Sequence, residues 1–113
     1  MASVSNITNR VIRELGQNEV TLVTTGSNQK GACVGLSLAN LTGSVVTVSV
    51  MLQDSYGTKG FYVKDLYIAP NSSARVINGG EKLLLAPNNI VSIICDTPKA
   101  LDVVFSLVII TYT

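Results

Sequence analysis

The segment Leu101–Tyr112, LDVVFSLVIITY, carries the strongest structural signal in this chain. One of its faces is entirely apolar and consists of Leu101, Val103, Phe105, Leu107 and Ile109. A repeat of two residues is typical of a β-strand whose apolar face packs in a hydrophobic core. The opposite face consists of Asp102, Val104, Ser106, Val108, Ile110 and Tyr112, and it becomes apolar after Ser106.

A strand with two apolar faces and little charge aggregates if it lies at a sheet edge. We therefore expect this segment to be a central strand, or to be covered by another subunit. The cover of its second apolar face is either a second layer of the same domain or another subunit, and the sequence allows both.

The same period of two recurs along the chain, in segments separated by turn-forming residues. In residues 32–40 it assigns Cys33, Gly35 and Ser37 to one face and Val34, Leu36 and Leu38 to the other. The predicted strands are 19–25, 32–40, 44–53, 61–68, 74–77, 81–85, 90–95 and 101–112. Seven or eight short strands without a long helix predict an all-β fold, an antiparallel β-sandwich of the jelly-roll or immunoglobulin-like type.

The N-terminal residues 1–17 allow two interpretations. Ile7, Val11 and Leu15 recur at helical spacing, and Ser5 is a residue type that caps helices. We favour an extended arm, because the segment has little Ala and several β-branched residues, and an isolated short helix is marginal. We expect an arm over residues 1–17 and one β-sandwich domain over residues 18–113.

The composition argues against catalysis, metal binding, nucleic-acid binding and membrane insertion. Of the 113 residues, 47% are hydrophobic and 13% are charged, the net charge is +1, and there is no His. Without His, the usual side chain for acid–base catalysis and zinc binding is missing, so we expect no enzyme, cofactor, metal or small-molecule substrate. Without a basic cluster we expect no nucleic acid partner, and without a long apolar run or a signal peptide we expect no membrane.

Cys33 and Cys95 are the only cysteines. Each lies in an apolar strand-like segment, where a free cysteine behaves as a small buried hydrophobic residue. The absence of a secretion signal makes a reducing site of synthesis the default. We therefore expect two core thiols, while a single disulfide between them stays open.

Five segments follow one another in a recognisable order: RVIRELG (10–16), LANLTGS (38–44), VKDLYIAPNSS (63–73), GEKLLL (80–85) and LDVVFS (101–106). Together they resemble a family of small virion structural proteins of tailed bacteriophages. The family usually has a Gly-Asp turn before its penultimate strand, whereas this chain has Pro87-Asn88-Asn89. Because Asn tolerates left-handed backbone geometry, the turn can survive this change.

The resemblance implies a non-enzymatic virion component, made in the host cytoplasm, such as a capsid decoration (cement), neck or tail protein. Its partners would be further copies of itself, as a homo-oligomer, and other virion proteins. We expect its interfaces to use residues of the arm and of the last strand: Val4, Ile7, Val11, Leu15, Val104, Val108, Ile110 and Tyr112. The alternative is a receptor- or carbohydrate-binding module of a phage fibre, with Tyr56, Phe61 and Tyr62 as an exposed aromatic platform.

Overall fold

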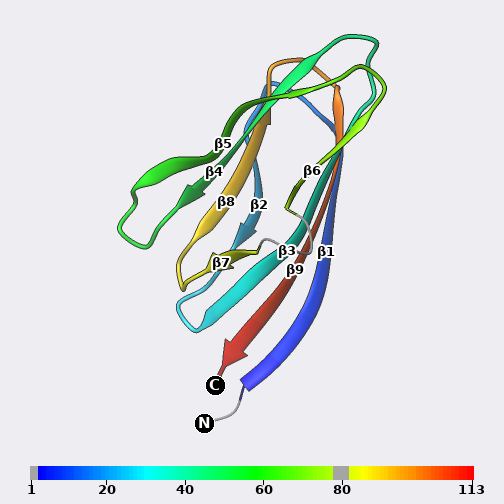
Figure 1. Ribbon diagram of the computed structural model, residues 1–113. Helices are drawn as coiled ribbons and strands as arrows, with labels where there is room; N and C mark the ends of the chain where they lie inside the picture. Colours follow the sequence, from blue (N-terminus) through cyan, green and yellow to red (C-terminus); the bar gives the residue numbers. More distant parts are fainter. Residues whose placement is uncertain (1–2, 78–81) are drawn as a thin grey trace.

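The computed structural model describes residues 3–77 and 82–113, which form two antiparallel sheets packed face to face (Figure 1). No helix occurs among these residues. The strands are β1 (Ser3–Leu15), β2 (Val20–Thr24), β3 (Gln29–Asn40), β4 (Val46–Gln53), β5 (Lys59–Ile68), β6 (Ser73–Ile77), β7 (Leu83–Leu85), β8 (Ile90–Cys95) and β9 (Leu101–Tyr112). The expected turn at 78–80 and the expected strand start at Glu81 lie outside the described residues.

The strand order identifies the type of sandwich. One sheet has the order β1-β9-β3-β6, with β7 also paired to β3, and the other has the order β2-β8-β4-β5. Strands β6 and β7 occupy the same edge, because β6 pairs with Leu36–Ala39 of β3 and β7 pairs with Gly31–Cys33. Among the described strands, the chain crosses between the sheets at every connection except β4–β5 and β6–β7, and this strand order is the jelly-roll arrangement. The expected all-β antiparallel sandwich is confirmed, and this topology selects the jelly roll over the immunoglobulin-like alternative.

The core lies between the two sheets and is built around β9. Leu101, Val103 and Phe105 are fully buried, and they pack in one cluster with Val50 and Ile93 of the other sheet. Strand β9 is central, between β1 and β3. The prediction of a central strand with one face in the core is confirmed. In this position the strand, whose one charged residue is Asp102, avoids an exposed sheet edge.

Strand β3 departs from the strict alternation that its sequence predicted. Its pairing with β9 shifts register between Cys33 and Gly35, so that Val34 is an extra residue in a β-bulge. A bulge moves all following side chains to the other face relative to the preceding ones. Cys33 consequently shares the core with Leu36 and Leu38, and its expected placement on the face of Gly35 and Ser37 was wrong.

The N-terminal segment is extended, as favoured, and pairs residue by residue with β9 from Ser3 to Ile12. A distortion follows at Glu14, whose φ is 55° and whose N–H donates to Asp102 Oδ1 at 3.0 Å. Leu15 then enters the core with 2% of its surface exposed. The division into an arm and a domain stays a prediction.

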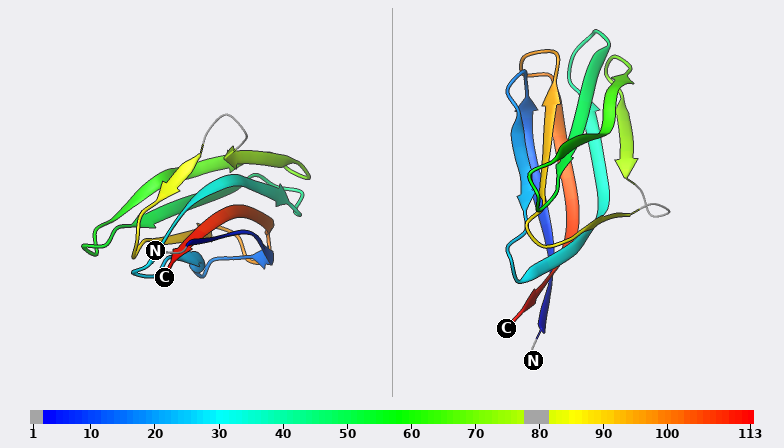
Figure 2. Two further views of the ribbon diagram at one scale, coloured as in Figure 1. Left: turned by 90° about the horizontal axis from the view of Figure 1, so that it is seen from below. Right: turned by 90° about the vertical axis from the view of Figure 1, so that its left-hand side faces the viewer.

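The start of β1 and the end of β9 lie next to one another beyond the end of the second sheet (Figure 2). Both faces of the first sheet are therefore open at this end.

Candidate assembly surface

The side of the first sheet that faces away from the core carries a continuous set of apolar side chains. In one row across four strands, Ile7 lies opposite Val108, Val108 opposite Ala32, and Ala32 opposite Leu84. Opposed residues of antiparallel strands point to the same face, so this row belongs to a single surface. We call this surface the outer apolar face and define it as Ile7, Val11, Ala32, Leu84, Val104, Val108 and Ile110.

Four large side chains of this face are exposed, while Val108 and Ile110 are half-buried. The exposed fraction is 82% for Ile7, 72% for Leu84, 62% for Val11 and 43% for Val104. A cavity of about 330 Å³ lies on the same face and is lined by Lys30, Gly31, Ala32, Leu84, Leu85, Val108 and Ile110. Clustered exposed apolar groups mark interaction surfaces, whereas single ones are normal on any protein.

Polar groups on this face are mostly bound by neighbours within the chain. The ammonium group of Lys30 lies 5.2 Å from the ring centroid of Tyr112, a cation–π distance. Ser106 Oγ donates to Asn9 Oδ1 at 2.9 Å, and Asp102 accepts the Glu14 N–H. The row of Ile7, Val108, Ala32 and Leu84 carries no charge, so an apolar neighbour on it would not bury a lone charge. Arg75 lies at the end of the neighbouring row, opposite Ser37, and is exposed.

The structure brings together most of the expected interface residues. Ile7, Val11, Val104, Val108 and Ile110 share the outer apolar face, and Tyr112 lies at its end. Val4 lies opposite Thr111, on the inner side of the overhanging end, with 51% of its surface exposed. Leu15 was expected in the interface, but it is buried in the core of the chain and cannot reach a partner. The reason is the distortion at Glu14, which turns the strand inward.

Two residues of the face were missed by the sequence reasoning, Ala32 and Leu84. A signal for Leu84 existed, because the triplet Leu83–Leu85 must point its middle residue away from the side that its neighbours bury. Ala32 lies on the outer apolar face, and Val34 and Leu36 do not follow it there in strict alternation, because of the β3 bulge. No feature of the sequence predicted that bulge.

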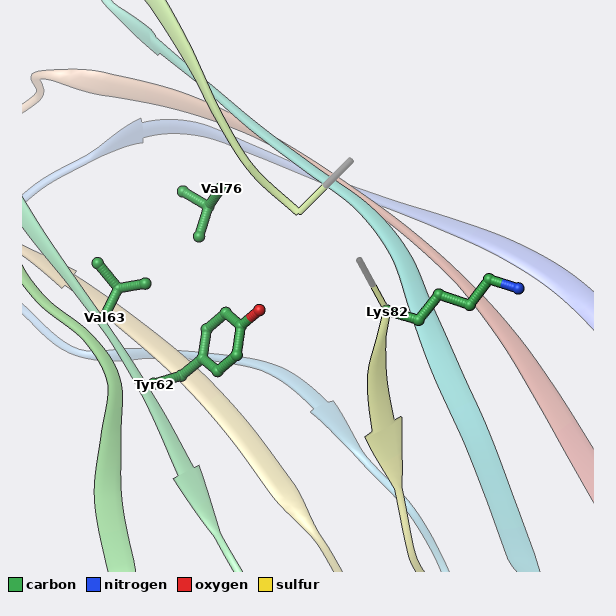
Figure 3. Close-up of a pocket in the computed structure, with 4 residues that line it drawn as sticks. All are labelled: Tyr62, Val63, Val76 and Lys82. Atoms are coloured by element: carbon green, nitrogen blue, oxygen red, sulfur yellow. The ribbon is translucent and has the colours of Figure 1, made fainter. Parts of the chain in front are cut away.

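The three aromatic residues of the alternative platform lie in different environments, two exposed and one packed on the core. Tyr56 is 91% exposed in the β4–β5 turn, and Phe61 is 56% exposed, with Lys64 Nζ 5.4 Å from its ring centroid. Tyr62 is the extra residue of a β5 bulge and packs against the core. There it lines a cavity of about 520 Å³ with Val63, Val76 and Lys82 (Figure 3).

The buried thiols are not set up as nucleophiles. Cys33 and Cys95 are free and buried, as expected for core thiols. Burial raises the pKa of the Cys33 thiol to about 12, and burial is also the main cause that raises the pKa of Cys95. A reactive cysteine needs the opposite shift. Within residues 3–77 and 82–113, no three His, Cys, Asp or Glu side chains gather in a way that could hold a metal ion.

Across the part of the chain that the structure describes, no helix is long and apolar enough to span a membrane.

Comparison with known proteins gives likenesses of fold. No family model matches the chain, and no curated protein matches its sequence. A chain from Bacillus endospore appendages, described as a novel family of disulfide-linked pili, superposes with a TM-score of 0.58 at 14% identity, over 96% of this chain and 87% of that one. A chain of the infectious bursal disease virus Gx strain superposes with a TM-score of 0.53 at 8% identity, over 98% of this chain but 33% of that one. At these identities the likeness shows a shared fold.

Proposed function

We propose that this chain is a non-enzymatic structural subunit of a tailed-phage virion, either a capsid decoration (cement) protein or a neck or tail component. It would be made in the host cytoplasm and then join copies of itself and other virion proteins. The observation that carries the proposal is the outer apolar face, whose uncharged row crosses four strands and whose Ile7, Val11, Leu84 and Val104 side chains are exposed in the single chain. The motif resemblance and the shared fold with a pilus and a virus chain support it.

The mechanism would be burial of this face. Apolar surface removed from water contributes roughly 25 cal/mol per Å², and a stable interface buries about 800 Å² on each partner. Part of that gain offsets the lost freedom of the associating subunits. Since the cysteines are buried, the contacts would be non-covalent, unlike those of the disulfide-linked pili.

The experiment compares Leu84→Asp with Tyr67→Asp, two changes at side chains that are 72% and 74% exposed. Leu84 lies on the outer apolar face, whereas Tyr67 lies on β5 in the other sheet, so the second variant controls for charge and exposure. Particles of a phage encoding this chain are purified on a density gradient, and copies of the chain per particle are counted by mass spectrometry. We expect the number of Leu84→Asp copies per particle to be at least tenfold below that of the wild type, while the number of Tyr67→Asp copies stays at the wild-type level. Absence of the wild-type chain from purified particles, or equal incorporation of Leu84→Asp, would refute the proposal.

A receptor- or carbohydrate-binding module of a phage fibre is the second candidate. The near-complete exposure of Tyr56 favours it, because exposed aromatic rings at a loop tip suit sugar stacking. A glycan array probed with wild type and Tyr56→Ala tests it. Binding that disappears in the variant would favour this candidate over the first.

A further inference from the structure

Strand β1 is an open sheet edge. It stands at the end of the order β1-β9-β3-β6, so none of the described strands pairs with its outer side. Its pairing with β9 runs from Ser3 to Ile12 without a bulge, which leaves a regular ladder of backbone groups on the free side. The N–H and C=O groups of such an edge are a template for another strand.

The other edges carry features that hinder strand addition. Edge strand β5 has two irregularities in its register and carries Lys59, Lys64 and Asp65. Strands β2, β6 and β7 have five, five and three residues. Bulges, charges and short length are the usual means by which proteins blunt a sheet edge. In β1, by contrast, residues 3–9 contain no charge and no Pro, and the three charged residues Arg10, Arg13 and Glu14 all lie in its second half.

The outer apolar face also ends abruptly at this edge. The row Leu84–Ala32–Val108–Ile7 stops at Ile7, which is 82% exposed and has none of the described strands on its far side. A strand added next to β1 with an apolar residue opposite Ile7 would continue the row and cover that side chain.

We infer that β1 pairs antiparallel with β1 of a second copy, with Ile7 on the two-fold axis, and so joins the two sheets into one. The inference deepens the proposed function and rests on it for the premise that the chain works as an assembled subunit. In this register Ile7 meets Ile7, Ser5 meets Asn9, and Val4 meets Arg10. Residues 3–11 of each copy are paired, and the apolar row extends unbroken through both copies.

Charge and geometry favour this register over its neighbours. Arg10 faces uncharged Val4 of the second copy, and Arg13 lies beyond the paired segment, so no like charges are opposed. A two-fold axis at Arg10 would oppose two guanidinium groups, and an axis at Asn9 would draw in the distorted backbone at Glu14. An axis at Thr8 would place Ile7 opposite Asn9 and break the apolar row. The strand is therefore self-complementary, which is what an isologous dimer requires.

Engineered cysteines test the pairing and its register in the full-length chain. Opposed residues of antiparallel strands have Cα atoms about 4.5–5.5 Å apart, within the range that a disulfide spans. Cys33 and Cys95 are 0% and 5% exposed and do not compete. Under mild oxidation at micromolar concentration, we expect Ile7→Cys to form a covalent dimer at least tenfold faster than Asn9→Cys. A mixture of Asn9→Cys with Ser5→Cys should give the heterodimer.

A second measurement does not depend on oxidation. Ile7→Asp places two carboxylates on the axis and should weaken dimerisation of the purified chain at least tenfold in sedimentation equilibrium. Tyr67→Asp is the matched control and should sediment as wild type. Equal cross-linking of Ile7→Cys and Asn9→Cys, preferential linkage of Ile7→Cys to a Phe61→Cys chain through β5, or a monomeric wild type at millimolar concentration would each overturn the inference.

These results are separable from those on the proposed function. A cross-linked Ile7→Cys dimer of a chain that is absent from virions would refute the virion role and leave the β1 pairing intact. A chain that is incorporated into virions but whose Ile7→Cys variant forms no cross-linked dimer would refute the β1 pairing and leave the virion role intact.

Discussion

Truncation of Leu15 to Ala tests where the N-terminal segment is anchored. Leu15 is 2% exposed, and its C=O accepts the N–H of Ala100 at 2.9 Å, so it fastens the end of β1 to the core. The change removes three carbon groups at about 0.8 kcal/mol each, or about 2.4 kcal/mol of transfer free energy. The cavity left behind raises the total cost to about 2–5 kcal/mol.

The matched change is Ile7→Ala on the same strand. Ile7 is 82% exposed, so its truncation should alter the unfolding free energy of the monomer by less than about 0.5 kcal/mol. The unfolding free energies of both variants are measured by urea denaturation followed by far-UV circular dichroism, at a concentration low enough to keep the chain monomeric. If Leu15→Ala costs no more than Ile7→Ala, residues 1–17 behave as one free arm and the anchoring argument fails.

Three further predictions concern the backbone, a buried amide and pH. Gly31→Ala should lower the unfolding free energy by about 1–3 kcal/mol, because an added Cβ would lie 2.4 Å from Val108 O, whereas Gly43→Ala has nothing within 4 Å and should be near neutral in the same denaturation assay. Asn40→Ala should cost about 1–3 kcal/mol and shift the thermal midpoint down, because its side chain donates to the carbonyls of Ser44 and Ile68 and accepts the Thr42 N–H. The pKa of the Cys33 thiol is about 12 in the folded chain, against an ordinary value of 9.0. The buried neutral thiol therefore contributes its full share to the unfolding free energy below pH 9, and this share falls by about 1.4 kcal/mol per pH unit as pH rises towards 12. Denaturation of wild type and Cys33→Ala between pH 8 and 10.5 should show their stability difference shrinking with pH, and a constant difference would contradict the assignment.

Local pattern was a good guide to the strands. The period of two in Leu101–Tyr112 predicted a central strand and its buried face, because alternation depends only on pleat geometry. Turn chemistry was equally readable: Asn88, in the turn Pro87-Asn88-Asn89, has a φ of 60°, the left-handed geometry that Asn tolerates.

The candidate surface was predicted in part. The side of β9 that stays out of the core was identified from its excess of apolar residues. Its neighbours across the sheet were not, because the β3 bulge at Val34 and the distortion at Glu14 change which side chains share a face. Such irregularities cost little locally and are selected by packing with the whole sheet, so they leave no fixed residue signature.

The sequence by itself determined an all-β chain with few charges, no His and one strand that is apolar on both faces. These properties follow from composition and short-range periodicity. The tertiary structure alone decided which strands adjoin, that Leu84 of β7 and Ile7 of β1 end one apolar row, and that β1 is the open edge. Those features join residues that are far apart in the chain, and the free energy of such contacts depends on a topology that local spacing does not encode.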